Sequence, residues 1–189
     1  EMFHRRERVA SLRQRIAGNQ LNTVNDLITN NINAQLLLTD AIDELDSGTK
    51  VAKLFEQVTG LTMFDPTCGS GAFLFAALEV LEDIYGHLID LARVLNSPET
   101  SKIIQLVDEQ PSSRYFIRKH CAIRNLYGTD LMPGAIETAK LRIFLALASC
   151  IDERSQLQPL PDLDFNLKVG NLVVGFKDAE DVERVGADL

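Results

Sequence analysis

The chain of 189 residues has few of the side chains that form crosslinks or metal clusters. Its three cysteines, Cys68, Cys121 and Cys150, are odd in number and far apart, which supports neither a disulfide framework nor a zinc site. The three histidines also lack the spacing of metal ligands. We therefore expect free thiols, no bound metal and a reducing, cytoplasmic setting.

Long apolar runs are missing as well. No stretch reaches the roughly twenty uncharged residues that a membrane helix needs, and the N-terminus is too charged for a secretory signal. The hydrophobic fraction of 46% is ample for one core, and the length fits a single compact domain. These features predict a soluble protein without a membrane partner.

Basic residues are outnumbered by acidic ones. The 19 Lys and Arg residues stand against 27 Asp and Glu residues, which gives a net charge of −8. Because proteins meet the DNA backbone mainly with Lys and Arg, the chain by itself is expected to bind DNA poorly. Any DNA binding would have to come from other parts of a larger protein.

One glycine-rich segment is the most informative part of the chain. Residues 64–73 read FDPTCGSGAF, and they overlap the short apolar run Leu61–Phe64, which we predict to be a buried parallel strand. Gly69 and Gly71 permit a tight turn and the close approach of a ligand to the main chain. The helix predicted to leave this turn, Ala72–Leu95, would present unpaired N–H groups that can receive a carboxylate or a phosphate.

The spacing around this turn counts against two common nucleotide sites. A dinucleotide fingerprint needs a third glycine where Leu74 stands, and a P-loop needs a lysine directly after its second glycine. Asp130 lies 130 − 71 = 59 positions after Gly71, whereas dehydrogenases place their acidic residue about 20 positions on. Asp65 repels phosphate and attracts an ammonium group. The pattern favours a ligand with a cation beside a carboxylate, as in the methionine part of S-adenosylmethionine.

Helical periodicity accounts for most of the remaining chain. Apolar residues at three- and four-residue spacing predict one or two helices over Asn22–Leu45 and a short one over Thr49–Val58. The region after Asn96-Ser97-Pro98 predicts two helices that are split near Gln110-Pro111. Pro133 fits the first turn of a further helix. The predicted buried stripe of that helix consists of Ile136, Ala139, Ile143 and Leu147.

Three segments of the chain form a recognisable set. They are Asp65–Phe75 (DPTCGSGAFLF), Asn125–Leu131 (NLYGTDL), in which Asp130 ends a strand, and Pro159–Asn171 (PLPDLDFNLKVGN). Together they resemble motifs of the adenine-N6 DNA methyltransferases. The first segment resembles the first cofactor motif of that family, and the second segment resembles the second cofactor motif. The third segment resembles the third strand and the turn beneath the cofactor adenine. The similarity is greatest to the methylase part of large fused type II (IIG-like) bacterial restriction-modification enzymes. It covers roughly residues 61–176.

The resemblance implies a fold and a division of the chain. The fold would be α/β, a partial Rossmann-like S-adenosylmethionine-dependent methyltransferase fold of parallel strands flanked by helices. Residues 1–58 would form an N-terminal helical segment that packs on the core, and residues 59–189 would form the partial cofactor-binding domain. Helices at about residues 96–124 would be an insertion, of the kind that large members of the family often carry there.

The resemblance also assigns a cofactor and its contacts. The cofactor would be S-adenosylmethionine, with its methionine end held by Asp65 and the glycine turn. Asp130 would accept hydrogen bonds from both ribose hydroxyls, since a carboxylate has enough acceptor sites for a bidentate contact. Leu131 and Asn171 would line the adenine. The full set of predicted cofactor-binding residues is Asp65, Pro66, Thr67, Cys68, Gly69, Ser70, Gly71, Phe73, Asp130, Leu131 and Asn171.

The chain departs from the family outside these three motifs. The family's catalytic tetrapeptide, Asn or Asp followed by Pro-Pro-aromatic, does not occur in residues 169–189, and the only Asp-Pro pair is Asp65-Pro66 of the cofactor turn. No aromatic-Thr-Pro element precedes the first motif, and Asn171 stands where many relatives carry Asp. We therefore expect an excised cofactor-binding piece, without a catalytic residue and inactive alone, of an enzyme that methylates DNA.

Other interpretations of the same residues stay open. The chemistry could serve a protein glutamine or an RNA base, or the fold could act as a non-catalytic binding or scaffold module. Gly69 and Gly71 could mark only close packing of a strand and a helix. Asp130 could be a helix N-cap, and Asn171 could be a turn former.

Overall fold

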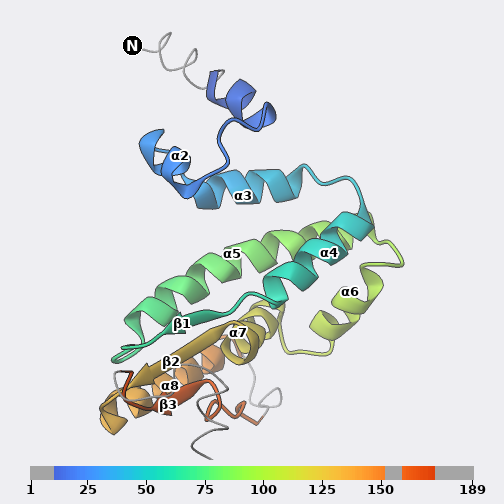
Figure 1. Ribbon diagram of the computed structural model, residues 1–189. Coiled ribbons are helices and arrows are strands. Elements are labelled where there is room, and N and C mark those ends of the chain that lie inside the picture. The colour runs from blue at the N-terminus through green and yellow to red at the C-terminus, as the bar shows by residue number, and fades with distance from the viewer. Residues whose placement is uncertain (1–10, 152–158, 173–189) are drawn as a thin grey trace, which may run out of the picture. The chain divides into compact units, whose positions relative to one another are not determined.

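The computed structural model describes residues 11–151 and 159–172, and its helices and strands are labelled in Figure 1. The chain divides into two compact units, residues 1–41 and residues 42–189. The division into a helical segment at residues 1–58 and a cofactor-binding domain at residues 59–189 stays a prediction. Within the described ranges, no helix is long and apolar enough to cross a membrane.

The first unit contains α2 (Val24–Thr29) and most of α3 (Ala34–Asp43). A reciprocal capping box begins α2: the Asp26 N–H donates to Thr23 Oγ1 at 3.2 Å, and the Thr23 N–H donates to Asp26 Oδ2 at 3.1 Å. Between the two helices Asn31 has a left-handed φ of 51°, which asparagine adopts more readily than most residues. The helical region predicted here is therefore two helices.

The second unit is an α/β structure built on three parallel strands. Its elements are α4 (Gly48–Thr59), β1 (Met63–Asp65), α5 (Ala72–Leu95), α6 (Ser101–Asp108), α7 (Ser113–Arg124), β2 (Leu126–Asp130), α8 (Pro133–Ala148) and β3 (Leu167–Val169). The strand order is β1-β2-β3, with Met63 opposite Leu126 and Gly128 opposite Leu167. Parallel strands joined through helices are the predicted partial Rossmann-like α/β fold, and that prediction is confirmed.

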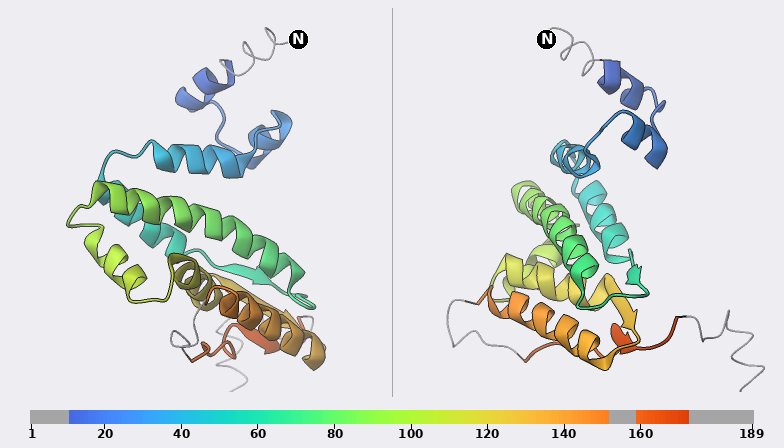
Figure 2. Two further views of the ribbon diagram at one scale, coloured as in Figure 1. Left: turned by 180° about the vertical axis from the view of Figure 1, so that it is seen from behind. Right: turned by 90° about the vertical axis from the view of Figure 1, so that its left-hand side faces the viewer.

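One face of the sheet carries the core. The helices α5, α7 and α8 pack against the strands (Figure 2), and Leu126 and Gly128 of β2 are buried. Successive side chains of a strand point to opposite faces, and Phe64 is 53% exposed. The prediction of a buried strand at Leu61–Phe64 is wrong in this respect, because a short apolar run does not reveal whether one face or both faces of a strand are covered.

The long helix α5 supplies most of the core. Its 24 residues present one apolar face at three- and four-residue spacing, as predicted. The buried residues are Leu74, Ala77, Leu78, Leu81, Ile84, Tyr85, Leu88, Ile89 and Ala92. The C-cap of the helix is Asn96, which has a left-handed φ of 41°, so the helix stops at the predicted Asn96-Ser97-Pro98 segment.

The region after α5 forms the two predicted helices, α6 and α7, with the break at Pro111. The N-cap of α7 is Ser112, whose hydroxyl oxygen accepts a main-chain N–H at 3.0 Å. Arg114 and Arg118 of α7 both form ion pairs with Glu82 of α5. These ion pairs and the buried face of α7 fix this helix to the core. That residues 96–124 are an insertion stays a prediction.

A buried hydrogen-bond network joins α4, α5 and β2. The side chain of Asn125 is fully buried and donates from Nδ2 to the carbonyl oxygens of Val58 and Leu61 at 2.8 and 2.7 Å. The Tyr85 hydroxyl lies 3.2 Å from Asn125 Oδ1 and 3.4 Å from Thr59 Oγ1. Because buried polar groups are costly unless paired, the network favours this one arrangement of the three elements.

The two fully buried tyrosines provide a matched test of this network. Tyr85→Phe should lower the free energy of unfolding by about 1 to 2 kcal/mol, because Asn125 Oδ1 loses its donor. The Tyr115 hydroxyl has no hydrogen-bond partner in the described part of the chain, so Tyr115→Phe should leave stability unchanged or raise it by about 1 kcal/mol. Urea unfolding of both variants measures the two changes in stability. An equal loss of stability in both variants would contradict the predicted role of the Tyr85 hydroxyl.

His120 of α7 lies against the same network. Its ring stacks on Phe116 with the centroids 5.3 Å apart, and its Nε2 lies 3.1 Å from Thr59 Oγ1. Burial, and secondarily the charge of Arg124, lowers the pKa of His120 to about 4. The folded chain therefore keeps this imidazole neutral at neutral pH.

The free energy of unfolding should consequently fall as the pH falls from 6.5 to about 4. In this window the unfolded chain takes up a proton on His120 that the folded chain excludes, so stability is lost on acidification. The contribution should not exceed about 1.4 kcal/mol per pH unit. Urea unfolding at several pH values in this window gives the dependence of the free energy of unfolding on pH. This pH dependence should be weaker in His120→Gln than in the wild type, whereas His87→Gln should keep the contribution of His120. An equal pH dependence in the wild type and in His120→Gln would contradict the predicted contribution of His120.

Candidate functional site

The turn between β1 and α5 is shaped by two glycines in left-handed conformations. Gly69 has a φ of 52°, and Gly71, the N-cap of α5, has a φ of 81°, a region that residues with a Cβ enter only with strain. A Cβ at Gly71 would also lie 3.2 Å from the Cβ of Ala139 in α8. A Cβ at Gly69 would meet no atom within 4 Å. Gly71 is therefore required by packing, whereas the main chain at Gly69 is open to a ligand.

Asp130, the last residue of β2, holds this turn in place. Its Oδ2 accepts the Gly69 N–H at 2.9 Å and its Oδ1 accepts the Met132 N–H at 2.9 Å. The bonds from Met132 and then Gly69 lower the pKa of Asp130, so the carboxylate is ionised at neutral pH. A carboxylate offers about four acceptor sites, so Asp130 keeps acceptor capacity for a ligand. The N-cap of α8 is Met132, so the interpretation of Asp130 as a helix N-cap is wrong.

Cys68 supports the turn through its main chain and a buried side chain. Its N–H donates to Thr129 O at 2.9 Å, and Thr129 Oγ1 donates to Pro66 O at 3.1 Å. The Cys68 side chain packs against Gly128, where an added Cβ would lie 3.0 Å from it. Burial first, and then two nearby carboxylates, raise the pKa of the Cys68 thiol. The thiol therefore stays protonated, which does not favour a reactive role.

The helix α8 supports the turn from the other side. Arg142 donates from its guanidinium group to Ser70 O at 2.8 Å and lies over the Phe75 ring, with its central carbon 4.3 Å from the ring centroid. Ala139 lies three residues earlier on the same face of the helix and contacts Gly71. The sequence did not point to Arg142, because its bond to Ser70 spans 72 residues and no local pattern predicts it.

The other polar residues predicted for the site lie at the same edge of the sheet. Asp65 ends β1, and its Oδ1 accepts the Thr67 N–H at 3.1 Å. Asn171 lies just after β3, and the preceding Gly170 donates its N–H to Asp130 O at 3.0 Å. The carboxyl ends of β1, β2 and β3 thus bring together segments far apart in the sequence. This edge is where ligands bind in open α/β sheets.

Exposed apolar side chains flank these polar groups. Phe73 in the first turn of α5 is 59% exposed, and Leu131 and Met132 after β2 are each 66% exposed. Apolar surface with a few convergent polar groups is suited to an organic ligand. Met132 was not among the predicted residues, although its position directly after Leu131 was an available signal. Together the groups can receive a ligand that has hydroxyls, an ammonium group and an apolar ring.

Comparison with known proteins gives two matches. A family model described as the MmeI DNA-methyltransferase domain matches residues 41–167, about two thirds of the chain. A putative type II restriction enzyme and methyltransferase from Methanocaldococcus jannaschii is 29% identical over 149 residues. That alignment covers 72% of this chain and 11% of the relative, so the chain spans only a small part of the relative's length. No solved structure matches the chain.

Gly71→Ala should destabilise the chain more than Gly69→Ala. Both changes place a Cβ at a left-handed φ, which costs about 1 to 2 kcal/mol, but only the change at Gly71 also presses on Ala139. By urea unfolding we expect a loss of about 1 kcal/mol for Gly69→Ala and of at least about 2 kcal/mol for Gly71→Ala.

A double-mutant cycle isolates the contact between the turn and α8. Adding Ala139→Gly to Gly71→Ala should recover part of the loss, because it removes the opposing Cβ. In the wild-type chain Ala139→Gly should only destabilise, since glycine is unfavourable inside a helix. If the losses of stability in the two single variants simply add up in the double variant, the two positions do not interact.

Proposed function

The chain belongs to the family of MmeI-type DNA-methyltransferase domains, and we propose that it is the S-adenosylmethionine-binding part of a site-specific adenine-N6 DNA methyltransferase of a restriction-modification system. The observation that carries the proposal is the bond from the Gly69 N–H to the Asp130 carboxylate, at 2.9 Å. This bond sets an open glycine turn beside an ionised carboxylate at the carboxyl edge of a parallel sheet, which is a suitable arrangement for a nucleoside ligand.

The residues at this edge suit S-adenosylmethionine chemically. The space beside Gly69, where a Cβ would meet nothing within 4 Å, allows a ligand to approach the main chain. Asp130 keeps acceptor sites for a ribose diol. Phe73 and Leu131 offer exposed apolar surface. When bound, S-adenosylmethionine supplies an electrophilic methyl group on its sulfonium.

Each predicted contact has a role in this proposal. Asp65 attracts the ammonium group of the methionine end, and the main chain of residues 66–71 with the N-terminal turn of α5 receives its carboxylate. Asp130 accepts hydrogen bonds from the ribose hydroxyls. Leu131 and Asn171 line the adenine. Arg142 holds the turn through Ser70 and so acts as a positioning residue.

We assign cofactor binding to this chain and methyl transfer to a larger protein. The Asn/Asp-Pro-Pro-aromatic tetrapeptide of the adenine-N6 methyltransferases that the chain resembles does not occur in residues 1–189. The net charge of −8 gives little attraction for the DNA backbone. In the proposed whole enzyme, other parts bind the DNA and present a flipped adenine to the cofactor.

Calorimetric titration with S-adenosylmethionine and S-adenosylhomocysteine tests the proposal. We expect weak, saturable binding by the wild type and no binding of NAD. Asp130→Ala should weaken the binding at least about tenfold, because the ligand would lose its hydrogen bonds to a charged acceptor, which are stronger than bonds between neutral groups. Asp108→Ala removes an exposed carboxylate of α6 that pairs with Arg93 and should bind like the wild type.

Circular dichroism and urea unfolding separate a binding defect from a folding defect. Asp130→Asn serves as a second variant, since it keeps an acceptor oxygen for a main-chain N–H while it removes the charge. A folded wild-type chain without saturable binding would refute the proposal for this chain. Unchanged affinity in Asp130→Ala would refute the assignment of Asp130, and methylation of DNA by the chain alone would refute the division of roles.

A further inference from the structure

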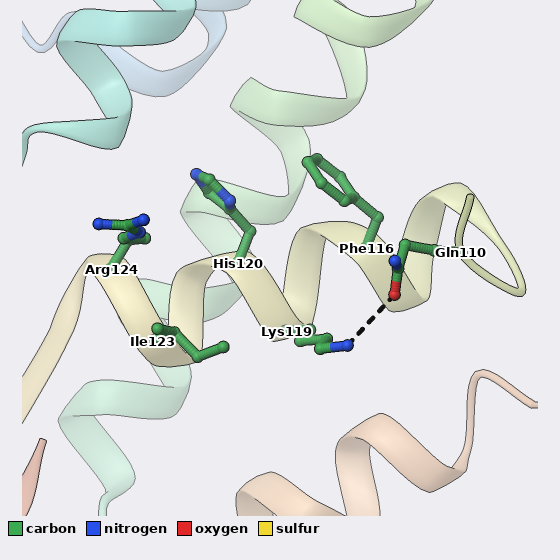
Figure 3. A pocket seen from close by; sticks show the side chains of 6 residues that line it. All are labelled: Gln110, Phe116, Lys119, His120, Ile123 and Arg124. Carbon is green, nitrogen blue, oxygen red and sulfur yellow. Dashed lines mark hydrogen bonds between the residues drawn. The ribbon is translucent and has the colours of Figure 1, made fainter. Parts of the chain in front are cut away.

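The residue directly before β3, Asn166, is polar and buried. It is 7% exposed, whereas the neighbouring Phe165 is 77% exposed. Its side-chain amide donates from Nδ2 to the carbonyl oxygens of Ile123 and Leu126, each at 3.0 Å. Ile123 lies in the last turn of α7, where it lines a hollow of about 230 Å³ (Figure 3). Asn166 therefore ties the start of β3 to the end of α7 and the start of β2.

The apolar pattern around β3 does not determine the register of this strand. Leu163, Phe165, Leu167 and Val169 alternate with polar residues, and of these four Leu163 and Leu167 are buried. A shift of the chain by two residues would put Phe165 and Val169 in the two buried places. Because side chains alternate with a period of two, such a shift keeps apolar residues on the same face. Another contact has to select the observed register.

The surroundings of Asn166 distinguish the two registers. In the observed one, its amide pairs two carbonyl groups and its main-chain oxygen accepts the Gly128 N–H at 2.8 Å. The shift by two residues would remove this amide and bring Lys168 to its buried place. Burying an ammonium group is costly. A single buried asparagine can fix a register in this way, as it does in coiled coils.

The register of β3 determines where the turn after it lies. Val169 is paired with Asp130, and the Gly170 N–H donates to Asp130 O at 3.0 Å. A parallel strand rises about 3.3 Å per residue, so a shift by two residues would move this turn by about 6 to 7 Å along β2. Asn171 would then lie opposite Asp130 instead of beyond it.

We propose that Asn166 is a positioning residue for the end of the candidate site that receives the base of the ligand. It keeps β3 in register, so that the turn at Gly170 and Asn171 lies beside Asp130. The inference rests on the proposed S-adenosylmethionine site, and it adds the residue on which discrimination of the adenine depends. Since Asn166 and Gly170 lie at opposite ends of β3, Asn166 acts through the strand and not by contact with the ligand.

Calorimetric titration with two ligands that differ only in their base tests this role. The wild type should bind S-adenosylhomocysteine about threefold to tenfold more tightly than S-inosylhomocysteine, which is the equivalent of about one hydrogen bond. In Asn166→Ala the two Kd values should become equal, because a displaced turn no longer distinguishes the bases. Ile103→Val changes a buried side chain of α6 and also lowers stability, but it should keep the wild-type ratio of the two Kd values.

NMR contacts between the strands report the register directly. The wild type should show contacts between main-chain protons of Gly128 and Leu167, which are paired. In Asn166→Ala, contacts between Gly128 and Val169 should replace them. Adding Phe165→Ser and Val169→Thr to Asn166→Ala should restore the wild-type contacts, because the shifted register would then place polar side chains inside.

The outcomes separate this inference from the proposed function. A folded wild-type chain that binds neither ligand contradicts the proposed function and the role of Asn166 with it. If the wild type binds but does not distinguish the bases, or if Asn166→Ala keeps the wild-type ratio or the pairing of Gly128 with Leu167, the inference alone is wrong. If circular dichroism shows that Asn166→Ala does not fold, Asn166→Ser replaces it, since a hydroxyl can still donate to one of the two carbonyl oxygens. The Kd ratio of that variant should lie between one and the wild-type value, and an unchanged ratio would again overturn the inference.

Discussion

The buried side chain of Asn125 fixes the geometry on which the rest of the second unit depends. Its amide group bonds to two carbonyl oxygens before β1 and lies within hydrogen-bond distance of Tyr85 in α5, while its main-chain oxygen accepts the Met63 N–H at 2.6 Å. These bonds align the starts of β1 and β2. Because the strands are parallel and in register, Asp65 and Asp130 then finish at one edge. The candidate site is thus determined by contacts made at the opposite end of the same strands.

The sequence was sufficient for the fold class, the family and most helices, because these depend on local or repeated signals. The apolar stripe of α5, the stop at Asn96 and the break at Pro111 are of this kind. The exposed face of the sheet at Phe64 and the role of Arg142 could not be predicted. Both depend on which distant element lies against a residue, and a side chain 72 positions from its partner leaves no periodic trace.

The two ends of the sheet differ in charge within one acidic chain. Asp65 and Asp130 finish their strands at the carboxyl edge, whereas Lys119 and Arg124 lie on the helix that leads into the start of β2. Arg114 and Arg118 of the same helix are paired with Glu82 of α5. Since charged ligands are selected by local potential more than by net charge, the net value of −8 does not describe either end.

The bond between Gly69 and Asp130 has a consequence for binding kinetics. The turn is held in its final shape by a side chain of the neighbouring strand before any ligand arrives. A ligand that meets such a preorganised loop does not need to order it, and little conformational entropy is lost on association. Association at this edge should follow a single concentration-dependent phase without a slower closing step, so that differences in affinity among ligands arise mainly from their dissociation rates.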